Sequence, residues 1–527
     1  MSASDSDILA VDSRHASLSD FNQGIASDLF ERTRRFQGFL KDWRGREFDR
    51  YLLPVLSYHG GRARVRENGQ GSVREVIMFC SADYLGLARD EAVLGAAAQA
   101  LRSHGASVSS VPAIAGTTDL HTELERHIAD FVGAEACVLF PTGHAANIGT
   151  IGALCGIRDL VVVDKQIHYS FIEGNQGSRM PLGELQALGS GPSCSGSRTS
   201  AVRRSDRGVL VVVEGVYGID GDVAPLAELS RVARHYGARL MVDDAHATGM
   251  LGAQGRGSAE SLGCPLPDLL MGSLSKALGS MGGWIATDTA TADYLRHFAK
   301  TIVFSVGLPG VQAAAASAAL QRIRDDGALL ARLRANIQVF QDGLAAEGIP
   351  QYKRGESAIH SVRIGYEPLM RDVLRDLFRE GVWAEGLIVP AVPRGEERVR
   401  FRIRAEHERQ DLERTVSVLA YVLRRNGVQA DAKRQSEGVS SPHRAEGRPF
   451  AEIVDVALAC AEEARSAPTW TSANAYRRIV AGEGPWESVC AEREAFTAAV
   501  DSASRAAAMP TSRATACIWG ANAWGSR

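Results

Sequence analysis

Long apolar runs are missing from this sequence. No stretch of about 18 consecutive apolar residues occurs, so no segment is long enough to cross a bilayer as a helix. The N-terminus, MSASDSDILAVDS, is polar and acidic, and it lacks the basic segment and apolar core of a secretory signal. We therefore expect no membrane span and a cytoplasmic location.

An excess of charge of either sign is also missing. The 59 lysines and arginines nearly balance the 62 aspartates and glutamates, for a formal net charge of −3 at pH 7. This balance gives no electrostatic basis for binding nucleic acid or an anionic membrane. The eight cysteines are scattered without paired spacing, which matches no zinc or disulfide pattern and suits a reducing compartment. We expect no metal site.

The 527 residues are too many for one compact domain, and 45% apolar with 23% charged residues is typical of a globular protein. We expect an N-terminal arm with an amphipathic helix (28–56) over 1–72, a large domain over 73–309 and a small domain over 310–427. Residues 428–527 are predicted to be a linker and a helical tail that packs on the body or binds a partner.

Short apolar runs alternate with helical segments through the large domain. This order predicts an α/β fold, with a mostly parallel sheet and helices on both faces. The runs predicted to be strands include LVVVD (160–164), GVLVVVEG (208–215), ARLMVDD (238–244), LPDLLMG (266–272) and GGWIATD (282–288).

The small domain is predicted to be an α+β unit, because IHSVRIG (359–365) and RVRFRIR (398–404) alternate with period two. Four arginines lie on one face of the second segment, at positions 398, 400, 402 and 404. Charges of this kind occur on solvated edge strands, where they prevent aggregation. Alternatively, the four arginines could line a binding site and face an anionic substrate.

Lys276 follows one buried strand, and Asp243 and His246 follow the preceding one. A lysine among small residues could lie in an ordinary surface loop. However, the carboxyl ends of parallel strands meet at the edge where open α/β sheets bind ligands. A buried acid, an imidazole and a Schiff-base lysine are what a pyridoxal phosphate site requires. The three residues together predict this cofactor.

Two further segments bear on the predicted site. VLF turns through Pro141 and Gly143 into a helix that begins near His144, and the backbone N–H groups of a helix start suit a phosphate. Glycine turns of this kind occur throughout α/β proteins, so this turn alone is weak evidence for a phosphate site. His168 follows the strand at 160–164 and is either a structural histidine or an aromatic face over a pyridine ring.

With these motifs, the chain resembles the α-oxoamine synthases over about residues 45–427. The resemblance implies a homodimer of PLP-dependent transferase fold type I, with an active site between subunits. It also implies decarboxylating condensation of glycine, alanine or serine with an acyl thioester, on coenzyme A or an acyl-carrier protein. Six motifs occur in the family's order: SADYLGL (81–87), FPTGHAAN (140–147), EGVYGIDGD (214–222), VDDAHATGMLGAQGRG (242–257), GSLSKALGSMGGW (272–284) and PAVPRGEERVRFRIRAEHE (390–408).

The resemblance assigns the catalytic roles to three residues. Lys276 is expected to hold the cofactor as a Schiff base and, once freed, to remove the α-proton of the amino acid. His168 is expected to stack on the ring, and His246 is expected to lie near the phenolic oxygen. Either histidine could polarise a substrate oxygen. Asp243 is expected to pair with the pyridine nitrogen.

The remaining roles concern the phosphate and the amino acid. Gly143 and His144 are expected to meet the phosphate or the ring through the helix start. Ser273 is expected to contact the phosphate. Arg400 matches the arginine that holds the substrate carboxylate in this family.

The chain departs from the family pattern at several positions. Ala82 replaces a common asparagine, and Gly218 stands where some members have serine. Val306 replaces a threonine or serine that often reaches the neighbouring subunit's phosphate, which puts that contact in doubt. Arg402 and Arg404 stand where threonines are common. These changes favour family chemistry on an unusual acyl donor, in a specialised biosynthetic pathway.

Three alternatives stay open from the sequence. The chain could catalyse another fold-type-I reaction, such as transamination, aldol cleavage or simple decarboxylation. It could be an inactive partner subunit, although Lys276, Asp243 and His246 are all present. The tail at 428–527 could be a docking module for a carrier protein.

Overall fold

The computed structural model describes residues 12–14, 16–21, 30–67, 71–157, 159–164, 166–178, 182–185, 208–351, 355–389, 391–428, 444–445 and 448–449. Most of the predicted tail at 428–527 therefore lies outside the described residues. Across the described ranges, none of the helices combines the length and the apolar character that crossing a bilayer requires.

The described residues form two compact units. The first contains the residues up to Gly86, Ile219–Gly221 and those from Ala328 to Val428. The second contains Leu87–Gly218, Asp222–Gly327 and the short strands β15 (Arg444–Ala445) and β16 (Arg448–Pro449). The domain boundaries expected from the sequence stay predictions.

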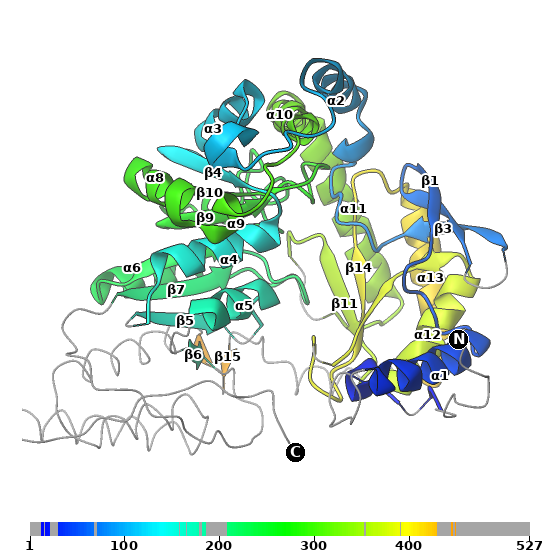
Figure 1. The fold of residues 1–527 in the computed structure, drawn as a ribbon. Helices are drawn as coiled ribbons and strands as arrows, with labels where there is room; N and C mark the ends of the chain where they lie inside the picture. The colour runs from blue at the N-terminus through cyan, green and yellow to red at the C-terminus, as the bar shows by residue number, and fades with distance from the viewer. Residues whose placement is uncertain are drawn as a thin grey trace, which may run out of the picture. The chain divides into compact units, whose positions relative to one another are not determined.

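A seven-stranded sheet lies at the centre of the second unit (Figure 1). Its order is β4-β10-β9-β8-β7-β5-β6, and all neighbouring pairs are parallel except the two that involve β10. The predicted α/β fold with a mostly parallel sheet is confirmed. The strands are β4 (Ala136–Phe140), β5 (Leu160–Asp164), β6 (Leu182–Leu185), β7 (Val209–Glu214), β8 (Arg239–Asp243), β9 (Leu269–Ser273) and β10 (Gly283–Thr287).

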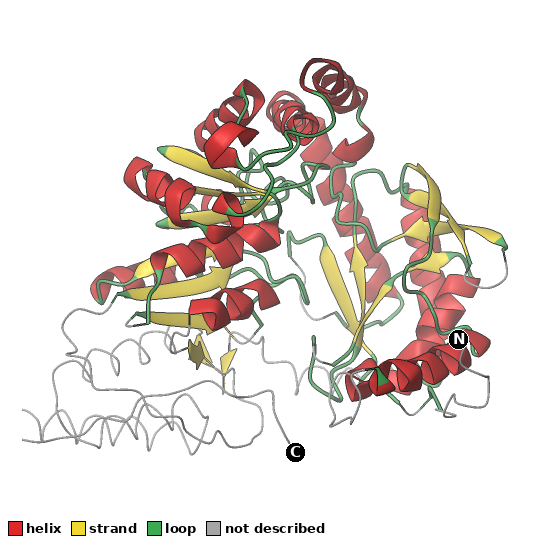
Figure 2. Cartoon of the chain, viewed as in Figure 1, coloured by secondary structure: helices red, strands yellow, loops and turns green. Residues whose placement is uncertain are grey.

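Burial explains why these apolar runs form strands. Every residue of β5, β7, β9 and β10 is buried, as expected for central strands that are covered on both faces. The second unit also contains the helices that Figure 2 shows around these strands. They are α2 (Glu91–His104), α3 (Asp119–Val132), α4 (Gly143–Leu154), α5 (Tyr169–Ser178), α6 (Leu226–His235), α7 (Ser258–Ser261), α8 (Thr289–Phe298), α9 (Lys300–Val303) and α10 (Gly310–Asp325), with short turns η3 (Leu87–Arg89) and η4 (Pro112–Gly116).

The first unit contains two smaller sheets, β1-β2-β3-β12 and β11-β14-β13. Its helices, besides the short turn η2 (Leu18–Phe21), are α1 (Glu31–Gly45), α11 (Gly327–Ala346), α12 (Glu367–Arg379) and α13 (Arg409–Arg425). Its strands are β1 (Val55–His59), β2 (Arg62–Arg66), β3 (Val73–Met78), β11 (Ile359–Arg363), β12 (Val382–Trp383), β13 (Glu385–Leu387) and β14 (Arg398–Arg402).

The prediction of one helix over residues 28–56 is wrong in its second half. The helix α1 ends at Gly45, and β1 and β2 form a hairpin where a helix end and a turn were expected. The backbone explains the early stop, because Glu47 and Leu52 both have positive φ angles, of 58° and 56°. Pro54, which removes a backbone donor, then precedes the hairpin.

The arginine-rich strand is not a solvated edge. The strand β14 lies between β11 and β13, and Arg398 and Arg400 are only 3% and 8% exposed. Arg398 Nη1 lies 2.5 Å from an Asp220 carboxylate oxygen. Arg404, just past the strand, is fully buried and pairs with Glu406. These charges are therefore balanced by carboxylates within the same unit, which a period-two pattern does not reveal.

Candidate active site

Parallel pairing brings the predicted lysine and aspartate to the same edge of the sheet. Asp243 is the last residue of β8, and its Cα partner on the neighbouring strand β9 is Met271. Lys276 lies three residues beyond the end of β9, in a turn, and His246 lies in the turn after β8. The structure therefore places all three at the carboxyl edge, as the order of the strands predicts.

The Asp243 carboxylate is buried and held by two donors. Its side chain accepts hydrogen bonds from Asn147 Nδ2 at 2.9 Å and from the Ala245 backbone N–H at 3.0 Å. The residue is 6% exposed. A desolvated carboxylate with fixed orientation favours a positively charged N–H partner, such as a protonated pyridine nitrogen.

Glu214 is a third acidic residue at this edge, and the sequence interpretation missed it. It ends β7, is buried, and accepts a 3.1 Å hydrogen bond from the Gly218 N–H. Burial raises the pKa of Glu214 to about 8, and the nearby charge of Asp243 adds to the rise. A carboxyl group directly after a run of buried valines was the signal available in the sequence.

The two consecutive aspartates have separate surroundings. Asp244 is fully buried and accepts hydrogen bonds from the Ser258 backbone N–H, at 2.8 Å, and from the Ser258 hydroxyl. Burial raises the pKa of Asp244 to about 7, although the Ser258 hydrogen bonds oppose the rise. Asp244 therefore ties the glycine-rich loop after β8 back to the strand end, while Asp243 is held by Asn147.

The start of α4 lies against the ends of β9 and β10. Thr142 caps the helix by accepting a 3.0 Å hydrogen bond from the Ala145 N–H. A Cβ at Gly283 would lie 2.6 Å from Thr142 O, and one at Gly143 would lie 3.3 Å from Ser273 Oγ. Side chains at positions 283 and 143 would crowd this approach, which brings the Ser273 hydroxyl close to the N-terminus of α4, where an anion is favoured.

Two imidazole rings lie together near the same helix start. The rings of His144 and His168 have centroids 6.1 Å apart and meet edge to face at 81°. Both residues are exposed, and His144 Nε2 lies 3.0 Å from a Glu173 carboxylate oxygen. The protein around His168 still desolvates the ring partly, and together with Lys276 it lowers the pKa of His168.

Arg400 belongs to the first unit, whereas the residues above belong to the second. Its Nη2 lies 2.7 Å from Glu385 Oε2, and Arg402 Nη1 lies 2.8 Å from the same oxygen. Two arginines thus share the carboxylate of Glu385. The role of Arg400 toward the substrate carboxylate stays a prediction.

These residues fit pyridoxal phosphate. Buried Asp243 suits the pyridine nitrogen, the start of α4 with Ser273 suits the phosphate, and Lys276 follows β9, the strand that pairs with the one carrying Asp243. The bound cofactor would supply an electron sink that stabilises negative charge on the α-carbon of an amino acid.

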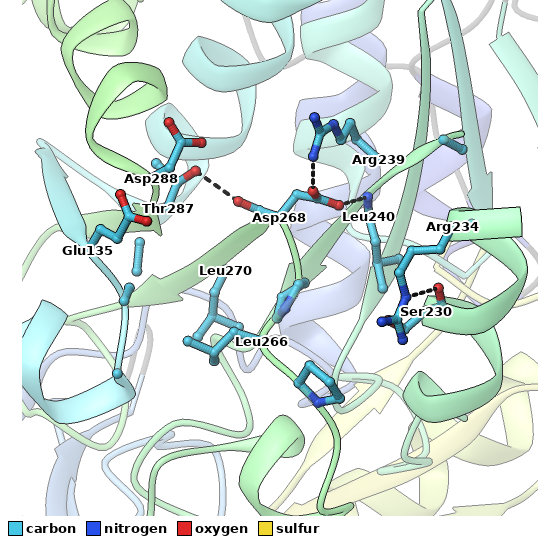
Figure 3. A pocket seen from close by; sticks show the side chains of 17 residues that line it. Glu135, Ser230, Arg234, Arg239, Leu240, Leu266, Asp268, Leu270, Thr287 and Asp288 are labelled. Atoms are coloured by element: carbon cyan, nitrogen blue, oxygen red, sulfur yellow. Dashed lines mark hydrogen bonds and ion pairs between the residues drawn. The ribbon is translucent and has the colours of Figure 1, made fainter. Parts of the chain in front are cut away.

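A separate hollow of about 380 Å³ lies at the opposite edge of the sheet (Figure 3). Its lining includes Arg239, at the start of β8, and Asp268, just before β9. Asp268 accepts hydrogen bonds from Arg239 at 2.5 Å and from the Leu240 N–H at 2.8 Å. Its polar groups therefore serve strand packing, and the hollow is not the predicted site.

Comparison with known proteins identifies the family. The family model for class I and II aminotransferases matches residues 74–419. The 8-amino-7-oxononanoate synthase of Geobacter sulfurreducens is 36% identical over 404 residues, which cover 75% of this chain and 100% of that protein. The chain belongs to the α-oxoamine synthases. PigH of a Serratia species, a 4-hydroxy-2,2'-bipyrrole-5-methanol synthase, is 32% identical over 78% of this chain and 62% of its own length.

Solved structures give the same result. The serine palmitoyltransferase of Sphingomonas wittichii matches with a TM-score of 0.68 and 27% identity, over 76% of this chain and 100% of that one. The S. paucimobilis enzyme, solved with bound PLP, matches with a TM-score of 0.69 and 25% identity over the same shares. This α-oxoamine synthase therefore has the fold-type-I architecture and uses pyridoxal phosphate. It condenses an amino acid with an acyl thioester, with loss of CO₂.

Proposed function

We propose that Lys276 and Asp243 are the two central residues of this condensation. The observation that carries the proposal is their placement, since Lys276 follows β9 and buried Asp243 ends the adjacent parallel strand β8. Lys276 would hold the cofactor, and its neutral amine would accept the α-proton of the amino acid. Asp243 keeps the pyridine nitrogen protonated, aided by the Asn147 hydrogen bond.

The other residues bind and orient. With the cofactor bound, His246 would interact with the phenolic oxygen and His168 would stack on the ring, while Gly143, His144 and Ser273 would hold the phosphate at the start of α4. Arg400 receives the carboxylate of the amino acid. The support for the roles in the second unit is the shared edge of the sheet, and the support for Arg400 is its match to the family's arginine in this strand.

We propose glycine, alanine or serine as the amino acid and an acyl group on coenzyme A or an acyl-carrier protein as the donor, in a specialised biosynthetic pathway. Substitutions such as Gly218 and Val306, which depart from the family pattern, support an unusual acyl chain.

We also propose that the chain acts as a cytoplasmic homodimer. Ile114 in η4 and Phe304 after α9 are 81% and 82% exposed, and Val306 is 52% exposed. The Gly307 N–H donates a 3.0 Å hydrogen bond to Ser110 O, which joins these two segments into one apolar surface. Large apolar side chains exposed together mark interaction surfaces. Phe304→Asp should yield monomers in light scattering.

The four described cysteines are free thiols, which suits the proposed cytoplasmic location.

The proposal is tested by absorbance spectroscopy of the protein with pyridoxal phosphate. Titration with glycine, alanine and serine should shift the visible band with one of them, and an acyl-CoA should change it further. Lys276→Ala should lose the resting band, whereas Lys300→Ala, an exposed lysine in α9, should keep it. A wild-type spectrum that equals that of Lys276→Ala would favour the inactive-subunit alternative.

A further inference from the structure

A buried chain of hydrogen bonds links Asp243 to His168. Asn147 Nδ2 lies 2.9 Å from Asp243 Oδ2 and 3.0 Å from Ser170 Oγ. Ser170 Oγ lies 2.7 Å from His168 Nδ1. Asn147 and Ser170 are 1% and 0% exposed, so water does not compete for the two bonds that Asn147 donates. The chain joins three elements, because Asp243 ends β8, Asn147 lies in α4 and Ser170 lies in α5.

The direction of each bond follows from the chemistry of its atoms. The Asp243 carboxylate, when ionised, only accepts hydrogen bonds, so the Asn147 atom that faces it must be the NH₂ group. The same NH₂ group has a second hydrogen, which it donates to Ser170 Oγ. This assignment fixes the orientation of the Asn147 amide on chemical grounds.

The Ser170 hydroxyl then has its own hydrogen left to donate. Its neighbour at 2.7 Å is His168 Nδ1, which also lies 3.3 Å from the Ser170 backbone N–H. A backbone N–H only donates, so Nδ1 must be an acceptor and carry no proton. We infer that Asn147 and Ser170 are positioning residues, which hold His168 as the neutral tautomer with its proton on Nε2.

This tautomer decides what His168 can do in the reaction, and that consequence rests on the proposed function. With Nδ1 already occupied, His168 meets the substrate only through Nε2–H. It therefore acts as a hydrogen-bond donor to a substrate oxygen, and it does not act as a general base. The charged groups around the ring are Asp243, Lys276 and His144, and the pKa of His168 is lowered, in agreement with a neutral ring.

The wild-type protein provides the first test without any substitution. Nitrogen NMR of the ¹⁵N-histidine-labelled protein distinguishes protonated from unprotonated ring nitrogens, and a His168→Gln sample assigns the signals. We expect Nε2 of His168 to show a protonated and Nδ1 an unprotonated nitrogen at neutral pH. A proton on Nδ1, or a fast mixture of both tautomers, would overturn the inference, whatever the enzyme's activity.

Two variants test the role of Ser170. Ser170→Ala removes the hydroxyl donor, so the two nitrogen shifts should move toward each other and the pKa of His168 should rise. The value of kcat/KM should fall roughly three- to tenfold, as expected for one lost hydrogen bond. Ser170→Thr keeps the hydroxyl and should restore the shifts. Unchanged shifts and an unchanged pKa in folded Ser170→Ala would also contradict the inference.

Discussion

A Cβ atom at Gly218 would lie 2.8 Å from Nε2 of His246. The imidazole therefore fills space beside position 218, where some family members have serine. Because the φ angle of Gly218 is not positive, alanine could adopt the same backbone, and the close contact alone opposes it.

We predict that Gly218→Ala displaces the His246 ring and lowers kcat by about ten- to a hundredfold, since small misplacements in an active site have effects of this size. The visible absorbance of the bound cofactor should shift as well, because His246 is proposed to lie near its phenolic oxygen. Gly152→Ala in α4 is the matched control, as a Cβ there meets nothing within 4 Å. Equal kinetics and spectra in both variants would argue against a contact of His246 with the cofactor.

The carboxylate shared by Arg400 and Arg402 gives a pair of opposite predictions. Arg400→Gln should raise the KM for the amino acid at least tenfold, because it removes the proposed partner of the substrate carboxylate. Glu385→Gln should lower this KM, because the substrate no longer competes with a charged side chain for Arg400. Steady-state kinetics with varied amino acid measure both, and a KM that moves in the same direction for both variants would refute the role of Arg400.

The raised pKa of Asp244 predicts a pH-dependent stability difference. The unfolded carboxyl ionises near its ordinary value of 3.8, whereas the folded one ionises near pH 7. Between these values the unfolded state has lost its proton and the folded state keeps it. The free energy of unfolding that Asp244 contributes is therefore full below about pH 4 and declines as the pH rises toward 7.

Asp244→Asn cannot titrate, and its amide oxygen can still accept from the Ser258 N–H while its NH₂ group donates to the Ser258 hydroxyl. We expect the free energy of unfolding of the variant, measured by urea titration, to rise relative to that of the wild type between pH 5 and pH 7, by an amount on the order of a few kcal/mol. Titrations common to both proteins cancel in this difference. A difference that stays constant with pH would show that Asp244 is ionised throughout.

The sequence predicted the fold and the central cluster because both depend on local patterns. Runs such as LVVVD and VLVVVE are continuous apolar strands, and parallel strands place the residues that follow them at one edge. This logic places Asp243, His246 and Lys276 at that edge from the sequence alone. These three residues predicted the cofactor, and the resemblance to the family's motifs then supplied the reaction.

The parts that the sequence did not reveal depend on contacts between distant residues. Asn147 and Ser170 are ordinary helix residues until folding brings them between Asp243 and His168. The alternating arginines suggested an edge strand, but β14 is central, because β13 pairs with it on the side away from β11. The pairing of β14 with β11 and with β13 is not evident from period-two spacing alone.

The most direct test of the proposed chemistry is the fate of a carboxyl-labelled amino acid. With wild-type protein, pyridoxal phosphate and an acyl-CoA, we expect labelled CO₂ and free thiol to be released one to one, and neither to appear without the thioester. Lys276→Ala should release neither. Release of CO₂ without the thioester, or conversion of the amino acid to its keto acid, would contradict the account and indicate a decarboxylase or an aminotransferase.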